Sequence, residues 1–498
     1  ELRLSQASDT QVDYLLQKAK RWISLQQKAN VEKRVAIVYY NHPPGRHNIG
    51  ADNLNVPETL FHLLHQLKAA GYNTGVLPET LDDLLDQIQA SAVNLPEDAA
   101  VLAEMAPRVP RMSKETYQAH LSQWPQALQQ ELIHGPLAFL ISSTQQAIRV
   151  AEQNGGLTHD DRDLLQRNLS ETFDSVHHLL EGADHPARLR ALNLLDQLRS
   201  AFSQCLDEPG VTAEASCWQE SYRFMTALKK TGIEGLRGWG EAPGRVMVWQ
   251  DEILLPGLQF GNIFIGPQPP RGWELNEELL HANTRFPPPH QYVAFYHYLK
   301  SQFKADALVH LGRHSTYEFL PRKRTGLSAD DYATGLIADL PSIYPYIVDG
   351  VGEGIQAKRR GSAVMIDHLT PPLVATPLYD DLLALRQLIE SFEAAEIRED
   401  ETGQNQAVIQ IRDTLSRLNL NEELEASMAA ELDVRGVSFD QVDDHLLVHE
   451  VGHYLTELQE EFMPLGLHVF GRDWQIEAVE TLLSSLSEDT AVQDKWRQ

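Results

Sequence analysis

A short apolar segment near the amino end, KRVAIVYYN (33–41), is the feature that most constrains the fold. Its β-branched and aromatic residues predict a buried strand. A Pro/Gly/Asn-rich loop (41–53) follows, and Pro57 then opens a helix that ends at Gly71, before a second predicted strand at 74–77. This order of elements predicts an open, mostly parallel α/β sheet, in which ligands bind beyond the carboxyl ends of the strands. Loop 41–53 is therefore a candidate ligand-binding loop.

The hydrophobic pattern changes along the chain and predicts an α/β multidomain protein with open, mostly parallel α/β sheets, a helical insertion and a helical carboxyl-terminal region. We expect an α/β domain over 1–95 and a helical domain or insertion over 96–238. A second α/β domain over 239–376 carries the candidate active site, and an acidic helical region follows over 377–498.

Composition excludes several classes of partner. The chain has 498 residues, 42% of them hydrophobic, and a formal charge of −28, so attraction to nucleic acid or to anionic lipid is not expected. No apolar run approaches the ~20 residues that a membrane span needs. The two cysteines, Cys205 and Cys217, are too few for a disulfide framework or a cysteine-rich zinc site, which fits a cytoplasmic protein.

The densest group of reactive side chains lies in DALVHLGRHSTYEFLPRKRTGLS (306–328). A predicted strand carries His310 at its carboxyl end, and His314, Ser315 and Glu318 open a predicted helix. Two imidazoles and a carboxylate suit a first-row divalent metal, and they also suit removal of a proton from a pyrrole nitrogen. A structural alternative stays open, because Ser315 and Glu318 have the spacing of a capping box.

A second group lies in YPYIVDGVGEGIQAKRR (344–360), where a strand runs into three glycines and a helix carries Lys358, Arg359 and Arg360. Glycines between a strand and a helix let backbone amides approach a carboxylate or phosphate. The G-x-G-x-G spacing does not match the dinucleotide fingerprint. Solvated surface charge remains an equal alternative for this basic triplet and for 322–324.

The segment HEVGH (449–453) matches the zinc-peptidase pattern H-E-x-x-H. However, Leu447, Val451 and Leu455 mark the apolar side of the predicted helix, so both histidines would lie on its charged side. Binding of zinc requires both histidines to face a cleft. A zinc peptidase is therefore the least favoured hypothesis. No G-x-x-x-x-G-K-[ST] occurs in the sequence, so ATP hydrolysis would need another chain.

Several segments taken together resemble the large subunit shared by cobaltochelatase and magnesium chelatase. They are KRVAIVYYNHPPG with LNVPETL, WGEAPGRVMVWQ, GNIFIGPQPPRGW, PPPHQYVAFYHYL, DALVHLGRHSTYEFLPRK, LPSIYPYIVDGVGEGIQAKRR and MPLGLHVFGR. They occur in the family's order over most of the chain, and the helical stretch near 135–236 is the main part without a counterpart. Chains of this family are much longer, so we expect the present one to correspond to their central portion.

The resemblance implies ATP-driven insertion of a divalent metal, most simply Co²⁺, into a tetrapyrrole macrocycle such as hydrogenobyrinic acid a,c-diamide. This chain would hold the macrocycle and the metal, and AAA+ partner subunits would hydrolyse ATP. The family's H-x-G-x-H-G-x-x-E segment maps onto His310, Gly312, His314 and Glu318, which makes both histidines and the glutamate the candidate catalytic residues and metal ligands. The candidate substrate-binding residues are Arg313, Arg322, Lys323, Glu353, Lys358, Arg359, Arg360, His290, Asn41 and His42.

Two departures from the family pattern add guanidinium groups. Arg313, His314 and Ser315 stand where the family commonly has T-H-G, and Pro321, Arg322 and Lys323 stand where it has P-G-K. Extra positive charge suggests either a more anionic macrocycle or a changed reaction. The second reading, a haem-binding dechelatase that releases iron, therefore remains an alternative.

Overall fold

The predicted strand near the amino end forms β1 (Val35–Tyr39), an inner strand of a six-stranded sheet in the computed structural model. The strand order is β5-β6-β1-β7-β8-β9, with β5 antiparallel to β6 and the remaining pairs parallel. All five residues of β1 are buried, as expected for a parallel strand covered on both faces. The other strands are β5 (Leu258–Phe260), β6 (Ile263–Pro267), β7 (Ala307–Leu311), β8 (Ser342–Ile347) and β9 (Val364–His368).

The structure describes most of the chain up to residue 368 and selected parts beyond it. The described residues are 8–41, 49–50, 53–95, 99–182, 185–233, 235–271, 286–312, 317, 319–329, 331–337, 339–348, 350–368, 379–397, 401–418, 420–421, 424–425, 428, 432, 438–442, 444, 447–448, 450–452, 454–455, 467–473 and 476.

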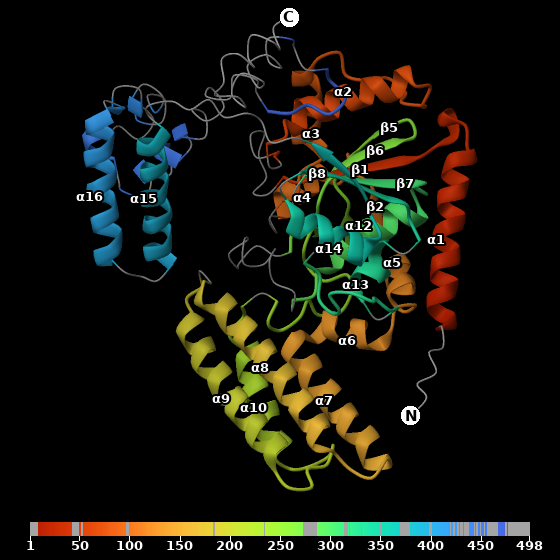
Figure 1. Ribbon diagram of the computed structural model, residues 1–498, viewed down its shortest axis with the longest axis vertical. Helices are drawn as coiled ribbons and strands as arrows, with labels where there is room; N and C mark the ends of the chain where they lie inside the picture. Colours follow the sequence, from red (N-terminus) through yellow and green to blue (C-terminus); the bar gives the residue numbers. More distant parts are fainter. Residues whose placement is uncertain are drawn as a thin grey trace, which may run out of the picture. The chain divides into compact units, whose positions relative to one another are not determined.

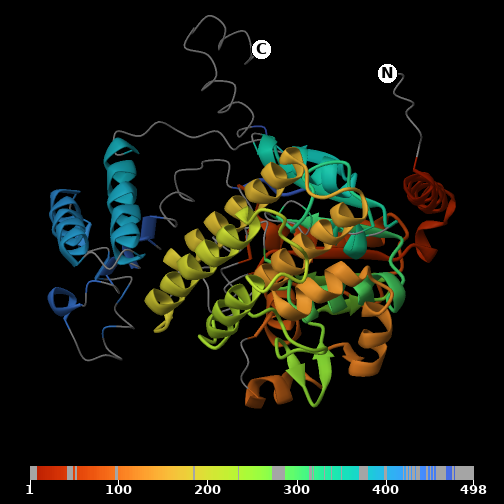
Figure 2. The same ribbon diagram turned by 90° about the horizontal axis from the view of Figure 1, so that it is seen from below.

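Helices cover both faces of the sheet (Figures 1 and 2). On one face, α2 (Val56–Ala69) and α3 (Leu81–Ser91) pack against Ile37 and Tyr39. On the other face, α12 (His290–Ser301), α13 (Tyr332–Ile337) and α14 (Val351–Gly361) pack against Val38 and Leu308. Further elements of this unit are α1 (Asp9–Gln27), η1 (Asn30–Glu32), α4 (Ala99–Met105), α5 (Lys114–Leu121), α6 (Gln126–His134) and a small sheet of β2 (Arg111–Ser113), β4 (Glu252–Leu254) and β3 (Val248–Trp249).

The helix after β1 begins where the sequence predicts. The Asn55 side chain accepts a hydrogen bond from the Glu58 amide at 3.0 Å, and Pro57 lies in the first turn. The chain leaves the helix at Gly71, whose φ of 83° is in the left-handed region that glycine tolerates. These local signals fix the direction in which α2 returns across the sheet.

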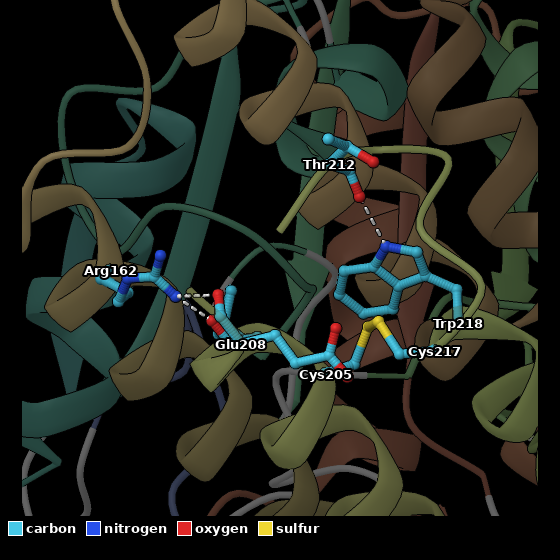
Figure 3. Close-up of a disulfide and its surroundings, with 7 residues drawn as sticks. Arg162, Cys205, Glu208, Thr212, Cys217 and Trp218 are labelled. Atoms are coloured by element: carbon cyan, nitrogen blue, oxygen red, sulfur yellow. Dashed lines mark hydrogen bonds between the residues drawn. A yellow bond between two sulfur atoms is a disulfide. The ribbon is translucent and has the colours of Figure 1, made fainter. Parts of the chain in front are cut away.

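The later part of the predicted helical insertion (96–238) forms a lobe of four helices, α7 (Pro136–Gln153), α8 (His159–Glu181), α9 (Arg188–Asp207) and α10 (Trp218–Lys229). In its earlier part, α4, α5 and α6 pack instead into the core of the sheet unit. The lobe's own hydrophobic core includes Leu169, Phe173 and Phe202. The two cysteines, Cys205 and Cys217, are bonded to each other, with a Cα–Cα distance of 5.3 Å. The Trp218 indole lies beside this bond and donates to the Thr212 carbonyl at 2.9 Å (Figure 3).

A second compact unit comprises residues 370–468 and 472–498. In its described part, α15 (Tyr379–Ile397) packs against α16 (Glu401–Leu418), and η2 (Phe439–Gln441) is a short 3₁₀ turn. Leu447, Val451 and Leu455 are buried in its core, so the predicted apolar side of that helix is confirmed.

Two expectations are corrected by the sheet. The strand predicted at 74–77 is wrong, because the position beside β1 is taken by β6, and residues 74–77 form an irregular connection. The segments 1–95 and 239–376 were expected as separate α/β domains, yet both contribute strands to one sheet through the pairing of β1 with β6 and β7. Of the helices in the described residues, none combines the length and the apolar character of a membrane span.

The disulfide predicts that the chain carries no free thiol. Titration with a thiol reagent in denaturant, without reductant, should detect none, and prior reduction should release both cysteines. Because the bond closes a short loop between α9 and α10, the Cys205→Ser/Cys217→Ser variant should lose about 3 kcal/mol of unfolding free energy. Urea unfolding followed by tryptophan fluorescence measures this loss. Two reactive thiols in the unreduced protein would contradict the pairing.

Candidate functional site

Parallel pairing brings the carboxyl ends of β1, β6 and β7 to one edge of the sheet. Asn41, buried and bridged to Ile49, follows β1, and Gln268 follows β6. Gly312 follows β7 with a φ of 137°, and a Cβ atom there would lie 3.2 Å from the Tyr40 amide nitrogen. A side chain at position 312 would therefore push the two strand ends apart.

His310 is the predicted site residue whose surroundings are best described. The register pairs it with Val38, and its side chain is 2% exposed. It belongs to what we call the tyrosine–histidine cluster, formed by His310, Tyr296, Tyr317 and Tyr344. The Tyr296 hydroxyl lies 3.1 Å from the His310 Nε2 atom, and the rings of Tyr317 and Tyr344 lie with their centroids 5.2 Å and 6.4 Å from the imidazole.

Burial keeps the His310 imidazole neutral. Loss of hydration lowers its pKa to about 3, because burial disfavours the charged form. Within the described residues, Nδ1 of His310 has no hydrogen-bond partner. In the tautomer whose Nε2 donates to the Tyr296 hydroxyl, Nδ1 carries the lone pair and can accept a proton or a metal ion.

Hydrogen bonds fix the cluster to neighbouring strands and helices. The Tyr317 hydroxyl lies 2.9 Å from the Ser342 hydroxyl, at the start of β8. The Tyr344 hydroxyl donates to the Glu353 carboxylate at 3.2 Å. Glu353, a predicted substrate-binding residue, is thus linked to His310 through the Tyr344 ring.

A buried amide network lies beside the same edge. The Asn94 side chain donates to the Gln268 carbonyl at 2.8 Å, and the Gln291 side chain donates to Asn94 Oδ1 at 3.2 Å. The Gln268 side chain donates to the Tyr292 hydroxyl at 3.4 Å. These residues were not predicted as part of the site. They tie β6 and the first turn of α12 together.

Two predicted substrate-binding arginines, Arg360 and Arg322, bond to other residues of the protein. Arg360 is 3% exposed and donates to the Pro321 carbonyl at 3.0 Å. Arg322 forms an ion pair of 3.0 Å with Glu131, and its guanidinium lies 3.7 Å from the centre of the Phe139 ring. These partners give both guanidinium groups a structural role, because a guanidinium withdrawn from water needs internal partners.

A third arginine was missed by sequence reasoning. Arg271 is 4% exposed and donates to the carbonyls of Phe319 at 3.0 Å and Phe286 at 2.6 Å. Arg271 therefore anchors the backbone of Phe319. The sequence gives no local signal for this role, since the contacting carbonyls lie far along the chain.

His290 also has a structural role. The Gly240 carbonyl can only accept, so Nε2 of His290 carries the hydrogen and donates at 2.8 Å. Nδ1 then accepts from the Tyr117 hydroxyl at 2.9 Å. Burial lowers the pKa of His290 to about 4, which favours the neutral ring. With both nitrogens bonded and 1% exposure, His290 is corrected from a substrate-binding residue to one that positions α12.

The remaining predicted residues fall into two sets. Lys323, Lys358 and Arg359 are exposed, and Lys323 donates to the Ser328 hydroxyl at 2.5 Å. The predicted glycine loop is instead the start of α14, because Gly350 caps this helix and Gly352 and Gly354 belong to its first turns. Outside the described residues lie Arg313, His314, Glu318, His42, His449 and His453. Among the described residues, no three His, Cys, Asp or Glu side chains are grouped as metal ligands.

The missed tyrosines left a partial signal in the sequence. Tyr292 and Tyr296 are four residues apart in HQYVAFYHYL, which places them on one face of a helix. Tyr344 and Tyr346 alternate along β8, which places both on one face of the sheet. The patterns predict shared faces, but they do not predict that the faces enclose His310.

Comparison with known proteins gives a consistent result. The family model described as CobN/Magnesium Chelatase matches residues 1–136 and 180–497. The unmatched residues between these ranges contain most of α7 and α8. The aerobic cobaltochelatase subunit CobN of Pseudomonas aeruginosa is 28% identical over 93% of this chain and 28% of its own length. The chloroplastic magnesium-chelatase subunit ChlH of Oryza sativa subsp. indica is 28% identical over 97% of this chain and 26% of its own length.

A solved structure supports the fold. The catalytic subunit of cobaltochelatase from Mycobacterium tuberculosis aligns with a TM-score of 0.50 and 23% identity, covering 96% of this chain and 31% of that one. The α/β multidomain fold class is therefore confirmed. The present chain spans between a quarter and a third of the length of these proteins.

The lowered pKa of His310 predicts acid sensitivity. Its pKa is about 3 in the folded protein and ordinarily 6.5, so the unfolded chain binds more protons between these values. The contribution of His310 to the free energy of unfolding is fully present above pH 6.5 and is lost as the pH drops toward 3. When the pH is lowered from 7.5 to 5, the free energy of unfolding of His310→Phe should therefore fall by about 2 kcal/mol less than that of the wild type. Urea unfolding at both pH values measures the difference.

His159→Phe is the matched control, because His159 has a side chain 86% exposed. It should leave the pH dependence unchanged. Equal pH dependence in His310→Phe and the wild type would show that His310 titrates normally in the folded protein.

Proposed function

Because the chain belongs to the CobN/Magnesium Chelatase family, we propose that it forms the tetrapyrrole-binding part of a metal chelatase. Its substrates are a free-base macrocycle and a divalent cation. We assign Co²⁺ and a corrin precursor such as hydrogenobyrinic acid a,c-diamide as this pair. The exposed cations Lys323, Lys358 and Arg359, in a chain of charge −28, support a macrocycle that carries carboxylates.

The observation that carries the proposal is the state of His310. A metal enters the macrocycle only after pyrrole N–H protons leave, so the site needs proton acceptors. His310 is neutral, and its Nδ1 atom has no partner among the described residues. Its strand ends at the edge where ligands of parallel α/β sheets bind.

His314 and Glu318 follow His310 in the chain and complete the proposed set. Glu318 accepts a proton from the macrocycle or carries the metal, and the two histidines assist in either role. The described neighbours of position 318 are anchored, since Tyr317 bonds to Ser342 and the Phe319 carbonyl accepts from Arg271.

Energy for insertion comes, in this proposal, from AAA+ partner subunits that hydrolyse ATP. The sequence has no phosphate-binding loop of the G-x-x-x-x-G-K-[ST] type. This chain therefore contributes macrocycle, metal and proton handling rather than nucleotide chemistry.

Replacement of the carboxylate tests the proposal. In the complete enzyme, Glu318→Gln should bind the free-base macrocycle with near-normal affinity, measured by quenching of macrocycle fluorescence. Metal insertion should fall by about a hundredfold or more, because the proton acceptor is lost. Glu104→Gln, a change of an exposed carboxylate, is the control and should insert metal normally.

Retained insertion in Glu318→Gln would remove this residue from the mechanism. Release of iron from haem without ATPase partners, combined with no insertion by the wild type, would favour the dechelatase instead. Turnover of Mg²⁺ and a porphyrin in place of Co²⁺ and a corrin precursor would correct the assigned substrate pair.

A further inference from the structure

A glycine-rich hollow outside the proposed set of reacting groups lies between residues 235 and 245. Its volume is about 350 Å³, and four glycines line it together with Arg237, Trp239, Glu241 and Arg245. This segment contains the WGEAPGR motif.

Close backbone packing builds the wall of this hollow. The Trp239 amide donates to the Leu132 carbonyl at 2.8 Å, which lays segment 236–240 against the end of α6. A Cβ atom at Gly238 would lie 2.4 Å from the Gly135 nitrogen, so a side chain would force the two segments apart. The Trp239 indole donates to the Pro287 carbonyl at 2.8 Å and fixes the ring. The wall is thus preorganised before any ligand arrives.

Two arginines and one carboxylate, Glu241, line the hollow, in a chain of charge −28. Arg237 is half-buried and forms no hydrogen bond or ion pair with any described residue. Arg245 is exposed at the same hollow. Burial and the charge of Lys229 lower the pKa of His134, and the carboxylate of Glu241, which lines the hollow, raises it. A partly desolvated guanidinium without a partner is suited to an anionic ligand.

The hollow adjoins the carboxyl edge of the sheet through α12. The Gly240 carbonyl accepts from His290, the first residue of α12. The next two residues, Gln291 and Tyr292, bond to Asn94 and Gln268 beside that edge. These buried hydrogen bonds join the wall of the hollow to the residues beside that edge.

Another hollow, between α7 and α8, is larger at about 580 Å³, but its lining is mostly apolar or uncharged. Asp161 is the charged residue in its described lining, and this carboxylate already accepts hydrogen bonds from Thr158 in a capping box. It offers no group that selects a ligand.

We propose that the hollow at 235–245 binds a carboxylate side chain of the macrocycle through the guanidinium group of Arg237, with the charge of Arg245 at the same hollow. The inference rests on the proposed tetrapyrrole-binding function and names a specificity-determining subsite for it. The planar guanidinium of Arg237 selects a doubly accepting carboxylate over a neutral amide.

The test compares two macrocycles that differ only in charge. Coproporphyrin, which carries free carboxylates, and its fully amidated derivative are titrated into the full chain while porphyrin fluorescence is followed. Arg237→Gln should bind coproporphyrin about tenfold or more weakly, the usual effect of losing a charge-assisted hydrogen bond. Its affinity for the amide should change less than about twofold, by the same reasoning.

Arg190→Gln removes the same charge from an exposed position on α9 and should leave both affinities unchanged. Arg245→Gln alters an exposed side chain, so it repeats the test if Arg237→Gln does not fold. Equal binding of coproporphyrin by wild type and variants overturns the subsite alone. An equal loss for both macrocycles also overturns it, because charge recognition is then absent. Wild-type protein that binds neither macrocycle overturns the proposed function together with the subsite.

Discussion

Parallel pairing of β1 with β6 and β7 is the constraint on which the rest of the site depends. It brings strand ends from residues 41, 268 and 312 to one edge, although they lie far apart in the chain. The same register puts His310 beside Val38, on the face that α12 covers. There the tyrosine–histidine cluster removes water from the imidazole and keeps it neutral. The chemistry at this edge thus follows from strand register as much as from residue type.

Burial separates the arginines that stabilise the protein from the one proposed to bind a ligand. Arg271 and Arg360 are buried and donate to backbone carbonyls of Phe319 and Pro321, so they stabilise the segment that follows the reactive motif. Arg322 pairs with Glu131 for the same reason. A buried guanidinium is costly without such partners, whereas a half-buried one such as Arg237 can await a ligand. Position in the fold, rather than density of positive charge in the sequence, separates the two roles.

The sequence predicted the elements with strong local signals. The strand at 33–41, the helix after it and the strand that carries His310 all occur where expected. The strand at 74–77 failed because its place in the sheet was taken by residues nearly two hundred positions later, which no local pattern reveals. His310 was proposed as a site residue from the residues and the family resemblance together. Its tyrosine neighbours and Arg271 were not, since their contacts join distant segments.

The central claim is that a buried, neutral His310 takes part when the macrocycle binds. The most direct measurement is NMR of protein labelled with ¹⁵N in its histidine rings, with the His310 signals assigned by their loss in His310→Gln. The account predicts that these signals report a neutral ring down to pH 5 and shift when a free-base macrocycle is added. Signals that titrate near pH 6.5, or that stay unchanged at saturating macrocycle, would contradict it.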